Sequence, residues 1–421
     1  METEKMDAPV PENTHTQKRN YIFLTLALFL AFAFFGFSDT VRSTALPRIQ
    51  DDMNLLEWHL GLLLAVTSIG YLLACSFTAR FARRIGIKAC LICALSIQFC
   101  SGALIFLSPN YASLIAAFFV LNFGNGMLDI STSVIAAKTF TTRTGAMMNL
   151  AHFFYGVGMI LSPVVSVRLM MASFGDGMLG WRYAYLIILG FAVVPAIPAL
   201  LGKLTKQDSD KKKTGYRAML RKPTIWLALL LLAFGSSAEM GLVVWFANFL
   251  ERAYSFTAER AADYLMWYFI CFALTRLLIG PLIDKIGLLN SLSIATALAG
   301  ILIISGALLG EQGSILLIVA GIGIAPIWPT AMAVIAKLFK DEIDLAMTTI
   351  MTTMGIIMVP GSYMIGGIIN QARVIFTRSH GDAGVGMAFT VGFLFIGLCC
   401  FGACLFALIL KSRQKMEGKT I

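Results

Sequence analysis

Long runs of apolar residues recur from one end of this chain to the other and limit what it can fold into. A run of about 20 apolar residues is long enough to cross about 30 Å of bilayer hydrocarbon as a helix. We count twelve such runs, at 21–45, 58–79, 88–107, 112–138, 145–171, 181–202, 223–250, 262–283, 289–309, 314–337, 345–369 and 386–410. With 58% hydrophobic and only 13% charged residues, the chain also lies outside the usual composition of soluble domains. The sequence therefore predicts an all-α membrane protein with twelve transmembrane helices.

Short segments of the first half reappear in the second half at a nearly constant offset. The matched segments are Arg83-Arg84-Ile85-Gly86 with Asp284-Lys285-Ile286-Gly287 at an offset of 201, and Val134-Ile135-Ala136 with Val334-Ile335-Ala336 and Ala146-Met147 with Ala346-Met347 at an offset of 200. A register kept over half a protein is typical of a duplicated bundle of membrane helices. We therefore expect two pseudo-symmetric six-helix bundles. The expected division is a tail 1–20, an N-terminal bundle 21–202, a linker 203–222, a C-terminal bundle 223–411 and a tail 412–421.

The distribution of lysine and arginine predicts the orientation. An even number of spans places both termini on one side, and the connections on that side are rich in basic residues: Arg80, Arg83, Arg84, Lys88, Lys138, Arg143 and eight in the linker 203–222. By the positive-inside rule, both tails and this linker are expected to be cytoplasmic, with the protein in the plasma membrane or, in a bacterium, the inner membrane. The net charge of +10 then follows from topology and does not indicate nucleic-acid binding. The linker is expected to be solvated, with contact to anionic membrane lipid as an alternative.

Motifs for other kinds of chemistry are absent from the sequence. All eight cysteines fall in predicted spans, and the CxxC at Cys90 and Cys93 has no second pair or nearby histidine, so we expect no metal site. The sequence has no Walker loop, no GxSxG and no HExxH, so we expect neither an enzyme nor a bound cofactor. The first twenty residues are polar and the following run is too long for a signal peptide, so the first span is expected to be retained.

Three carboxylates lie deep inside predicted spans, where insertion scales give a charged group a penalty of about 2.5–3.5 kcal/mol at the helix centre. Each is expected either to have a partner or to face a water-filled cavity. Asp39 has Arg42 three residues later on the same helical face, and the two can pair. The others share their spans with further polar or aromatic residues: Asp129 with Asn122 and Asn125, and Glu239 with Ser236, Trp245 and Asn248. For each carboxylate the alternative is a buried pair that only fixes helix packing.

Two further spans carry polar or aromatic candidates. The fifth places Asn149, His152 and Tyr155 at steps of three residues, and the imidazole could relay protons or serve as hydrogen-bonded scaffolding. In the tenth, Pro326 and Pro329 flank Trp328 and precede Thr330. A helix broken by proline inside the bilayer is tolerated mainly where it lines a cavity. We expect Trp245 and Trp328 to act as stacking surfaces for a sugar, and Trp267 to be a core residue.

Three stretches resemble signatures of a known transporter family. Residues 280–287, Gly-Pro-Leu-Ile-Asp-Lys-Ile-Gly, resemble the loop signature of the major facilitator superfamily between spans 8 and 9. Residues 126–129 with 149–158, and 238–241 with Trp245, resemble spans 4, 5 and 7 of its fucose permease-like branch of sugar:proton symporters. The resemblance extends over nearly the whole chain. The chain departs from the loop signature at Arg83, where the first half normally has an aspartate. The charge contact that usually holds the cytoplasmic side closed is therefore in doubt on that half.

The resemblance implies an alternating-access carrier in which spans 1, 4, 7 and 10 surround a central cavity. In that branch, acidic residues of spans 1 and 4 take part in proton coupling and sugar binding, and Asp39 and Asp129 occupy those places. We expect proton coupling at Asp39, Asp129 and Glu239. We expect substrate binding at these three residues together with Arg42, Asn122, Asn125, Asn149, His152, Tyr155, Trp245, Asn248, Trp328 and Thr330.

The residue types suit the transport of a sugar with protons. Asn, Asp, His and Tyr side chains supply donors and acceptors for hydroxyl groups, and tryptophan stacks on the apolar face of a sugar ring. A carboxylate in a poorly hydrated cavity takes up a proton readily, which removes a charge before it crosses the bilayer. We therefore predict a monomeric importer of a small polar solute, such as a monosaccharide. The alternatives are a proton-coupled exporter of drugs or metabolites, which the Phe-rich and Met-rich spans favour, and a non-transporting receptor with a carrier fold.

Overall fold

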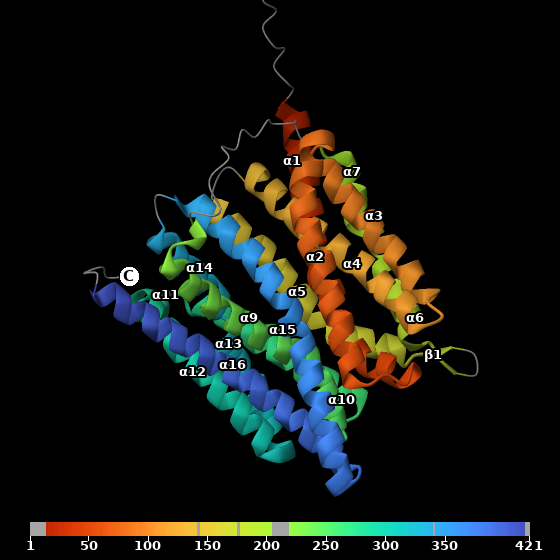
Figure 1. Ribbon diagram of the computed structural model, residues 1–421. Coiled ribbons are helices and arrows are strands. Elements are labelled where there is room, and N and C mark those ends of the chain that lie inside the picture. Colours follow the sequence, from red (N-terminus) through yellow and green to blue (C-terminus); the bar gives the residue numbers. More distant parts are fainter. Residues whose placement is uncertain (1–13, 141–143, 175–176, 204–218, 340–341, 417–421) are drawn as a thin grey trace, which may run out of the picture.

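The computed structural model describes residues 14–140, 144–174, 177–203, 219–339 and 342–416 of the chain (Figure 1). The N-terminal half contains α1 (Thr14–Asp52), α2 (Glu57–Ile85), α3 (Ile87–Phe106), α4 (Tyr111–Thr139), α5 (Thr144–Met170), α6 (Gly180–Gly190) and α7 (Val193–Leu201). The C-terminal half contains α9 (Pro223–Tyr254), α10 (Ala258–Leu278), α11 (Gly280–Ile286), α12 (Leu288–Leu308), the 3₁₀ helix η1 (Gly310–Gly313), α13 (Ser314–Ile324), α14 (Ile327–Leu338), α15 (Ile343–His380) and α16 (Ala383–Met416). Parts of both predicted tails and of the predicted linker, 1–13, 204–218 and 417–421, lie outside the described residues.

Within the described residues, twelve helical segments are long and apolar enough to cross a membrane, and each overlaps one of the twelve predicted runs. The prediction of an all-α membrane protein with twelve spans is therefore confirmed. Two spans are interrupted. Span 6 consists of α6 and α7, and span 10 consists of η1, α13 and α14. A two-stranded ribbon, β1 (Ser173–Phe174) with β2 (Gly177–Met178), lies between α5 and α6 and was not predicted from the sequence.

The duplicated segments occupy equivalent places in the two halves. Gly86 ends α2 and Gly287 ends α11, and each is followed directly by the next span. Their backbone angles are nearly the same, with φ +89° and ψ 151° at Gly86 and φ +90° and ψ 149° at Gly287. L side chains rarely adopt such positive φ values, which explains why the repeat keeps glycine at both corners.

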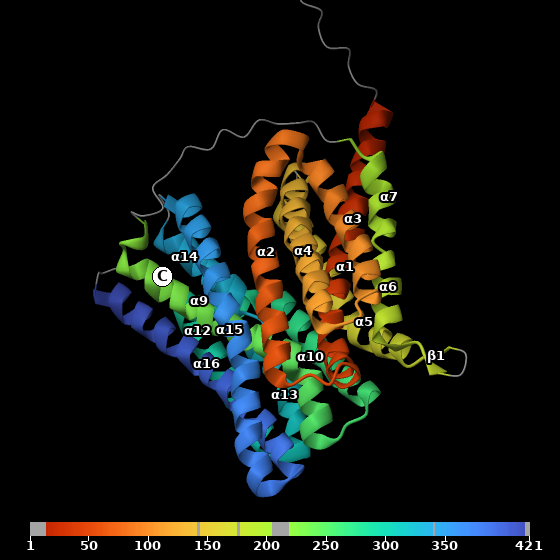
Figure 2. The ribbon, with the colours of Figure 1, turned by 45° about the vertical axis from the view of Figure 1, so that its right-hand side comes forward.

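Helices of the same half pack mainly on one another, and two main seams join the halves, with a smaller contact between α1 and α9. In the first half α1 packs on α5 and α2 on α4, while in the second α9 and α12 both pack on α16. The seams are formed by α2 against α15 and by α5 against α10 (Figure 2). The halves approach one another at the lower end of Figure 2 and diverge at its upper end, where α1 begins. We call this upper end, which carries the α2–α3 corner and its arginines, the basic end.

Candidate functional site

A cavity of about 2190 Å³ lies between the two halves. Its walls come from α1, α2, the start of α3, α4 and α5 on one side and from α9, α10, α14 and α15 on the other. The lining extends to Arg83, Lys88 and Lys138, so the cavity reaches the basic end. Spans 1, 4, 7 and 10 all contribute to the wall, as the resemblance implies.

At the end opposite the basic end, ion pairs join the two halves. Arg48 of α1 donates to Glu251 of α9 over 2.5 Å, and Arg252 of α9 pairs with Asp51 of α1. Side chains of Arg48 and Glu251 are partly buried, so this contact is screened less than a surface pair. These contacts hold α1 against α9.

A second set of contacts at this end centres on Glu57, whose side chain is 1% exposed. Arg373 of α15 donates to Glu57 Oε1 over 2.6 Å, and Gln50 of α1 donates to the same oxygen over 3.0 Å. Gln50 in turn accepts a hydrogen bond from Asn248 of α9, at 3.1 Å. The network joins α1 and α2 to α9 and α15. Together, the two sets close this end of the molecule.

Asp39 and Arg42 face the cavity and pair as their spacing predicts. Arg42 Nη2 lies 3.2 Å from Asp39 Oδ1, and both side chains are partly buried. The pair comes from consecutive turns of α1, so it needs no other helix to form. An arginine and a carboxylate at the cavity wall offer both hydrogen-bond donors and acceptors to a bound solute.

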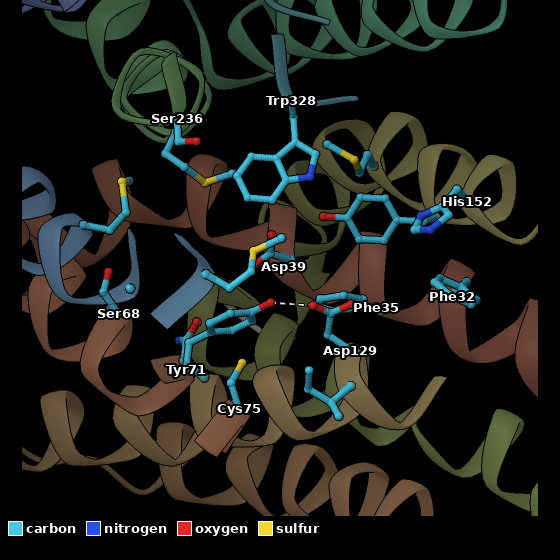
Figure 3. A pocket seen from close by; sticks show the side chains of 18 of the residues that line it. Phe32, Phe35, Asp39, Ser68, Tyr71, Cys75, Asp129, His152, Ser236 and Trp328 are labelled. Carbon is cyan, nitrogen blue, oxygen red and sulfur yellow. Dashed lines mark hydrogen bonds between the residues drawn. The ribbon is translucent and has the colours of Figure 1, made fainter. Parts of the chain in front are cut away.

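Asp129 faces the cavity from α4 and has a neutral partner (Figure 3). The Tyr71 hydroxyl of α2 donates to Asp129 Oδ2 over 2.5 Å. Among the described residues Asp129 forms no ion pair, whereas Asp39 and Glu239 each face an arginine. Its charge is therefore the least compensated of the three carboxylates.

Glu239 of α9 faces Arg276 of α10, with Arg276 Nη2 3.5 Å from Glu239 Oε1. Arg276 Nε also donates to the carbonyl of Ala325 over 3.1 Å, in the gap between α13 and α14. Pro329 has no N–H, so it cannot supply the helical hydrogen bond that this carbonyl would otherwise accept from four residues on. Arg276 thus satisfies the carbonyl that the proline leaves open. The predicted break of span 10 is confirmed, and it borders the cavity.

Several other predicted residues line the cavity. His152 packs on Phe32 with ring centroids 5.2 Å apart, and Tyr155 on Phe35 at 5.1 Å. Trp328 enters from α14, and in Figure 3 its indole lies across the cavity from the Tyr71–Asp129 hydrogen bond. Asn122 also contributes to the wall, although its side-chain amide already donates to the Phe118 carbonyl over 3.0 Å.

The structure places other predicted site residues away from the cavity surface. Asn125 is buried and accepts a hydrogen bond from Gln98 of α3, which turns it toward the neighbouring helix. Asn248 belongs to the closed end, and Thr330 is buried outside the lining. In this state of the molecule these three side chains offer no surface to a solute, and their roles in substrate binding stay predictions. Asn149 lies on α5, but its side chain is outside the described residues.

Two tryptophans also differ from the prediction. Trp245 borders the cavity, yet its side chain is 1% exposed because it packs into the core near Phe389. It therefore presents no stacking face in this state. Trp267 is 52% exposed and lies outside the cavity lining, so its assignment to the core was wrong. A single tryptophan in an apolar span carries no signal that separates core from lipid-facing surface.

Sequence reasoning missed Tyr71 and Arg276, the partners of two of the carboxylates. Arg276 lies within the eighth predicted span, and an arginine at that depth is as costly as a carboxylate. The same search applied to basic residues would have found it. Tyr71 carries no comparable signal, since its partner is 58 residues away on another helix. Among the described residues, no group of three or more His, Cys, Asp and Glu side chains could hold a metal ion.

Comparison of the sequence with known protein families identifies the family of this chain. The model of the Major Facilitator Superfamily matches residues 28–309. This chain belongs to the Major Facilitator Superfamily. The fold, the integral multi-pass membrane character and the prediction of a transporter rather than an enzyme are thereby confirmed.

Two solved structures share the fold of this chain at low sequence identity. A bacterial homologue of the human lysosomal transporter Spinster, inward-facing and unoccupied, matches with a TM-score of 0.76 and 15% identity, over 95% of this chain and 99% of that one. The fucose:proton symporter of E. coli matches with a TM-score of 0.60 and 19% identity, over 93% and 99%. These two likenesses show the shared fold.

Two curated relatives resemble part of the chain. The D-xylose transporter of Levilactobacillus brevis is 25% identical over 178 residues, which are 42% of this chain and 37% of that protein. Polyol transporter 5 of Arabidopsis thaliana is 24% identical over 197 residues, 46% of this chain and 35% of that protein. The chain thus spans about a third of the length of these relatives.

Proposed function

We propose that this protein is a secondary active transporter that imports a small polar solute of the sugar or polyol class together with protons, by alternating access. The observation that carries the proposal is the cavity between the halves, into which carboxylates from spans 1, 4 and 7 all face. A superfamily carrier needs such a central site, and the D-xylose and polyol transporters among the relatives favour this solute class.

The three carboxylates differ in a way that suits proton coupling. Asp39 and Glu239 each lie beside an arginine, whereas among the described residues Asp129 forms no ion pair and accepts a hydrogen bond from the Tyr71 hydroxyl. An uncompensated carboxylate is unfavourable in a poorly hydrated cavity, and binding a proton removes its charge. We infer that Asp129 is the main proton-binding group, with Asp39 and Glu239 in supporting roles. Proton coupling through Asp129 requires that a proton bind to one conformational state of the carrier more tightly than to the other.

The described state is proposed to be the inward-facing one. The cavity reaches the basic end, and the opposite end is closed by contacts of Glu57 and Glu251 with the other half. The positive-inside rule assigns the basic end to the cytoplasm, which also makes both termini cytoplasmic. A solute released from Asp129 and its neighbours would then leave through the basic end.

Reconstitution tests the proposal. Purified protein in proteoliposomes is offered a panel of labelled sugars, polyols, amino acids and organic acids, under inward-directed, outward-directed or no proton gradient. We expect an inward-directed gradient to drive accumulation of at least one sugar or polyol, and a protonophore to abolish it. Accumulation that needs an outward-directed gradient would identify an exchanger, and no movement of any solute would favour the receptor.

Proton-coupled export is the second candidate. A thioclapurine efflux transporter of Claviceps purpurea is 25% identical over 183 residues, and six methionines line the cavity: Met159, Met240, Met347, Met351, Met354 and Met358. Methionine adapts to varied apolar ligands. The direction of the gradient that drives accumulation decides between the two candidates.

A further inference from the structure

Four methionines form a stripe along one face of α15. Met347, Met351, Met354 and Met358 follow one another at steps of four, three and four residues, which keeps them on the same side of a helix. All four line the cavity, and the face continues toward the closed end with Gly361 and Ile365. We call the four side chains the methionine stripe.

The stripe belongs to a continuous apolar wall. Met354 is part of a buried cluster against which Met347, Met358 and Trp328 also pack. Met351, which is 43% exposed, projects into the cavity more openly. Trp328 of α14 adds an aromatic face beside these thioethers. Sulfur and aromatic groups attract one another, and both are suited to contact with a flat apolar ligand.

The wall supplied by the first half is different in character. Asp39, Arg42, Asp129 and His152 all contribute to it. The duplication makes the contrast direct, because an offset of 200 aligns His152 with Thr352 and Tyr155 with Gly355 on α15. Where α5 presents an imidazole and a phenol, α15 presents a short side chain and a glycine between methionines. The part of the wall formed by α14 and α15 is therefore apolar, whereas the first half and the Glu239–Arg276 pair of α9 and α10 supply polar groups elsewhere on the wall.

The size of the cavity exceeds what an unsubstituted monosaccharide needs. Ligand pockets measure about 300–1,000 Å³, whereas this cavity measures about 2190 Å³. Part of that space is the passage to the basic end, but Met351 and the partly buried methionines beside Trp328 add apolar surface that a free sugar, covered with hydroxyl groups, does not contact.

We propose that the preferred substrate is an amphipathic sugar or polyol that carries an uncharged aromatic or alkyl substituent, such as a glycoside with an apolar aglycone. This inference rests on the proposed function and specifies its substrate class. The hydroxyl-bearing part lies against Asp39, Asp129 and His152, and the substituent lies between Trp328 and the methionine stripe. The flexible thioethers adapt to substituents of different shape, so the site selects for an apolar group rather than for one particular group.

Binding of matched glycosides tests this assignment. The protein is held in lipid nanodiscs, because alkyl glycoside detergents would compete for the site. Calorimetry then compares methyl and phenyl β-glycosides of glucose, galactose, xylose and fucose. For at least one sugar we expect the phenyl glycoside to bind at least tenfold more tightly than the methyl glycoside, which is about 1.4 kcal/mol.

Variants of α15 connect that preference to the stripe. Met351→Ser should reduce the phenyl preference to about threefold or less, and Met351→Leu, which keeps the apolar volume, should retain that preference. Met364 is a matched control, since it lies on the same helix, is 46% exposed and is outside the cavity lining. Met364→Ser should leave both affinities unchanged.

The outcomes separate the two levels of proposal. Methyl glycosides that bind as tightly as phenyl glycosides would overturn the amphipathic substrate while leaving sugar transport intact. A phenyl preference unaffected by Met351→Ser, or equally reduced by Met364→Ser, would also overturn it. If no sugar or polyol binds or is transported, with or without a substituent, the proposed function fails and this inference fails with it.

Discussion

At the scale of single residues, the site depends on how each charged group in the cavity is compensated. The Asp39–Arg42 pair was predictable because a spacing of three residues on one helix fixes the proximity of the two side chains, and they lie 3.2 Å apart. The partner of Asp129 was not predictable, since Tyr71 approaches from another helix and its approach depends on how α2 packs on α4. Local periodicity indicates which polar residues share a face but not which helix lies opposite.

Replacement of Asp129 tests its role as the proton-binding group. Asp129→Asn keeps the shape of the side chain and removes the titratable proton. We expect gradient-driven accumulation of solute in proteoliposomes to fall at least tenfold, while counterflow exchange of solute at equal pH remains at least partly intact. Asp263→Asn is the control, because this carboxylate is exposed near the start of α10 and does not line the cavity. Accumulation at the wild-type level in Asp129→Asn would assign coupling to another group.

The Asp39–Arg42 pair should be detectable in stability. Arg42→Ala leaves a partly buried carboxylate without its cation, and we expect a loss of about 1–3 kcal/mol, seen as a lower melting temperature in nanodiscs. Adding Asp39→Asn to the same chain should recover part of this loss, because the remaining side chain is then neutral. If the effects of the two changes simply add, the pair contributes nothing to the fold.

At the scale of elements, the break between α13 and α14 shows how sequence and packing combine. Pro326 and Pro329 predict an interrupted helix, but the sequence does not say what replaces the lost hydrogen bond. In the structure the guanidinium of Arg276, on a different span, occupies that place and also faces Glu239. The interruption and the Glu239–Arg276 pair are therefore one structural unit.

This unit yields a rescue prediction. Arg276→Met removes the donor to the Ala325 carbonyl and the partner of Glu239, and we expect a loss of about 2–4 kcal/mol in stability. Pro329→Ala in the same chain restores an N–H four residues after Ala325, so part of the loss should be recovered. The double variant, both single variants and the wild type are compared by thermal unfolding in nanodiscs. No recovery would mean that the carbonyl finds another donor, such as water in the cavity.

The close crossing of α1 and α5 leads to a second prediction at the scale of helices. A Cβ atom placed on Gly36 would lie 2.0 Å from the backbone oxygen of Tyr155, closer than atoms can approach. Small residues allow such close contact between membrane helices. Gly36→Ala should therefore force α1 and α5 apart and lower the melting temperature by several degrees. Gly190→Ala is the control, because nothing lies within 4 Å of the corresponding position.

At the scale of the whole molecule, the twelve spans and the duplication were predictable from the sequence. The spans follow from local hydrophobicity, and the duplication follows from segments that recur at a nearly constant offset. The sequence did not predict which end of the cavity is closed. Closure depends on residues about 200 positions apart, such as Arg48 with Glu251, and on Glu57 with Arg373, 316 positions apart. No helical period connects such pairs, and under the proposed alternating access each must separate when the carrier opens at that end.

Under the proposed alternating access, the contacts at the closed end set the balance between the two states of the carrier. Glu57 receives hydrogen bonds from both Arg373 and Gln50 while almost fully buried, so Glu57→Gln should weaken closure more than loss of an exposed pair would. Every 1.4 kcal/mol lost from the closed end changes the ratio of the two states about tenfold. Spin labels on cysteines at Leu56 and Asp382, in a cysteine-free background, report the distance between the halves at that end. We expect Glu57→Gln to increase the population with the longer distance. Lys222→Gln is the control, because it removes an exposed ion pair with Glu342 at the basic end. It should leave the distance distribution at the closed end unchanged or shift it less. A distribution in Glu57→Gln identical to that of the wild type would show that the packing of α2 on α15, rather than this charge network, keeps the end closed.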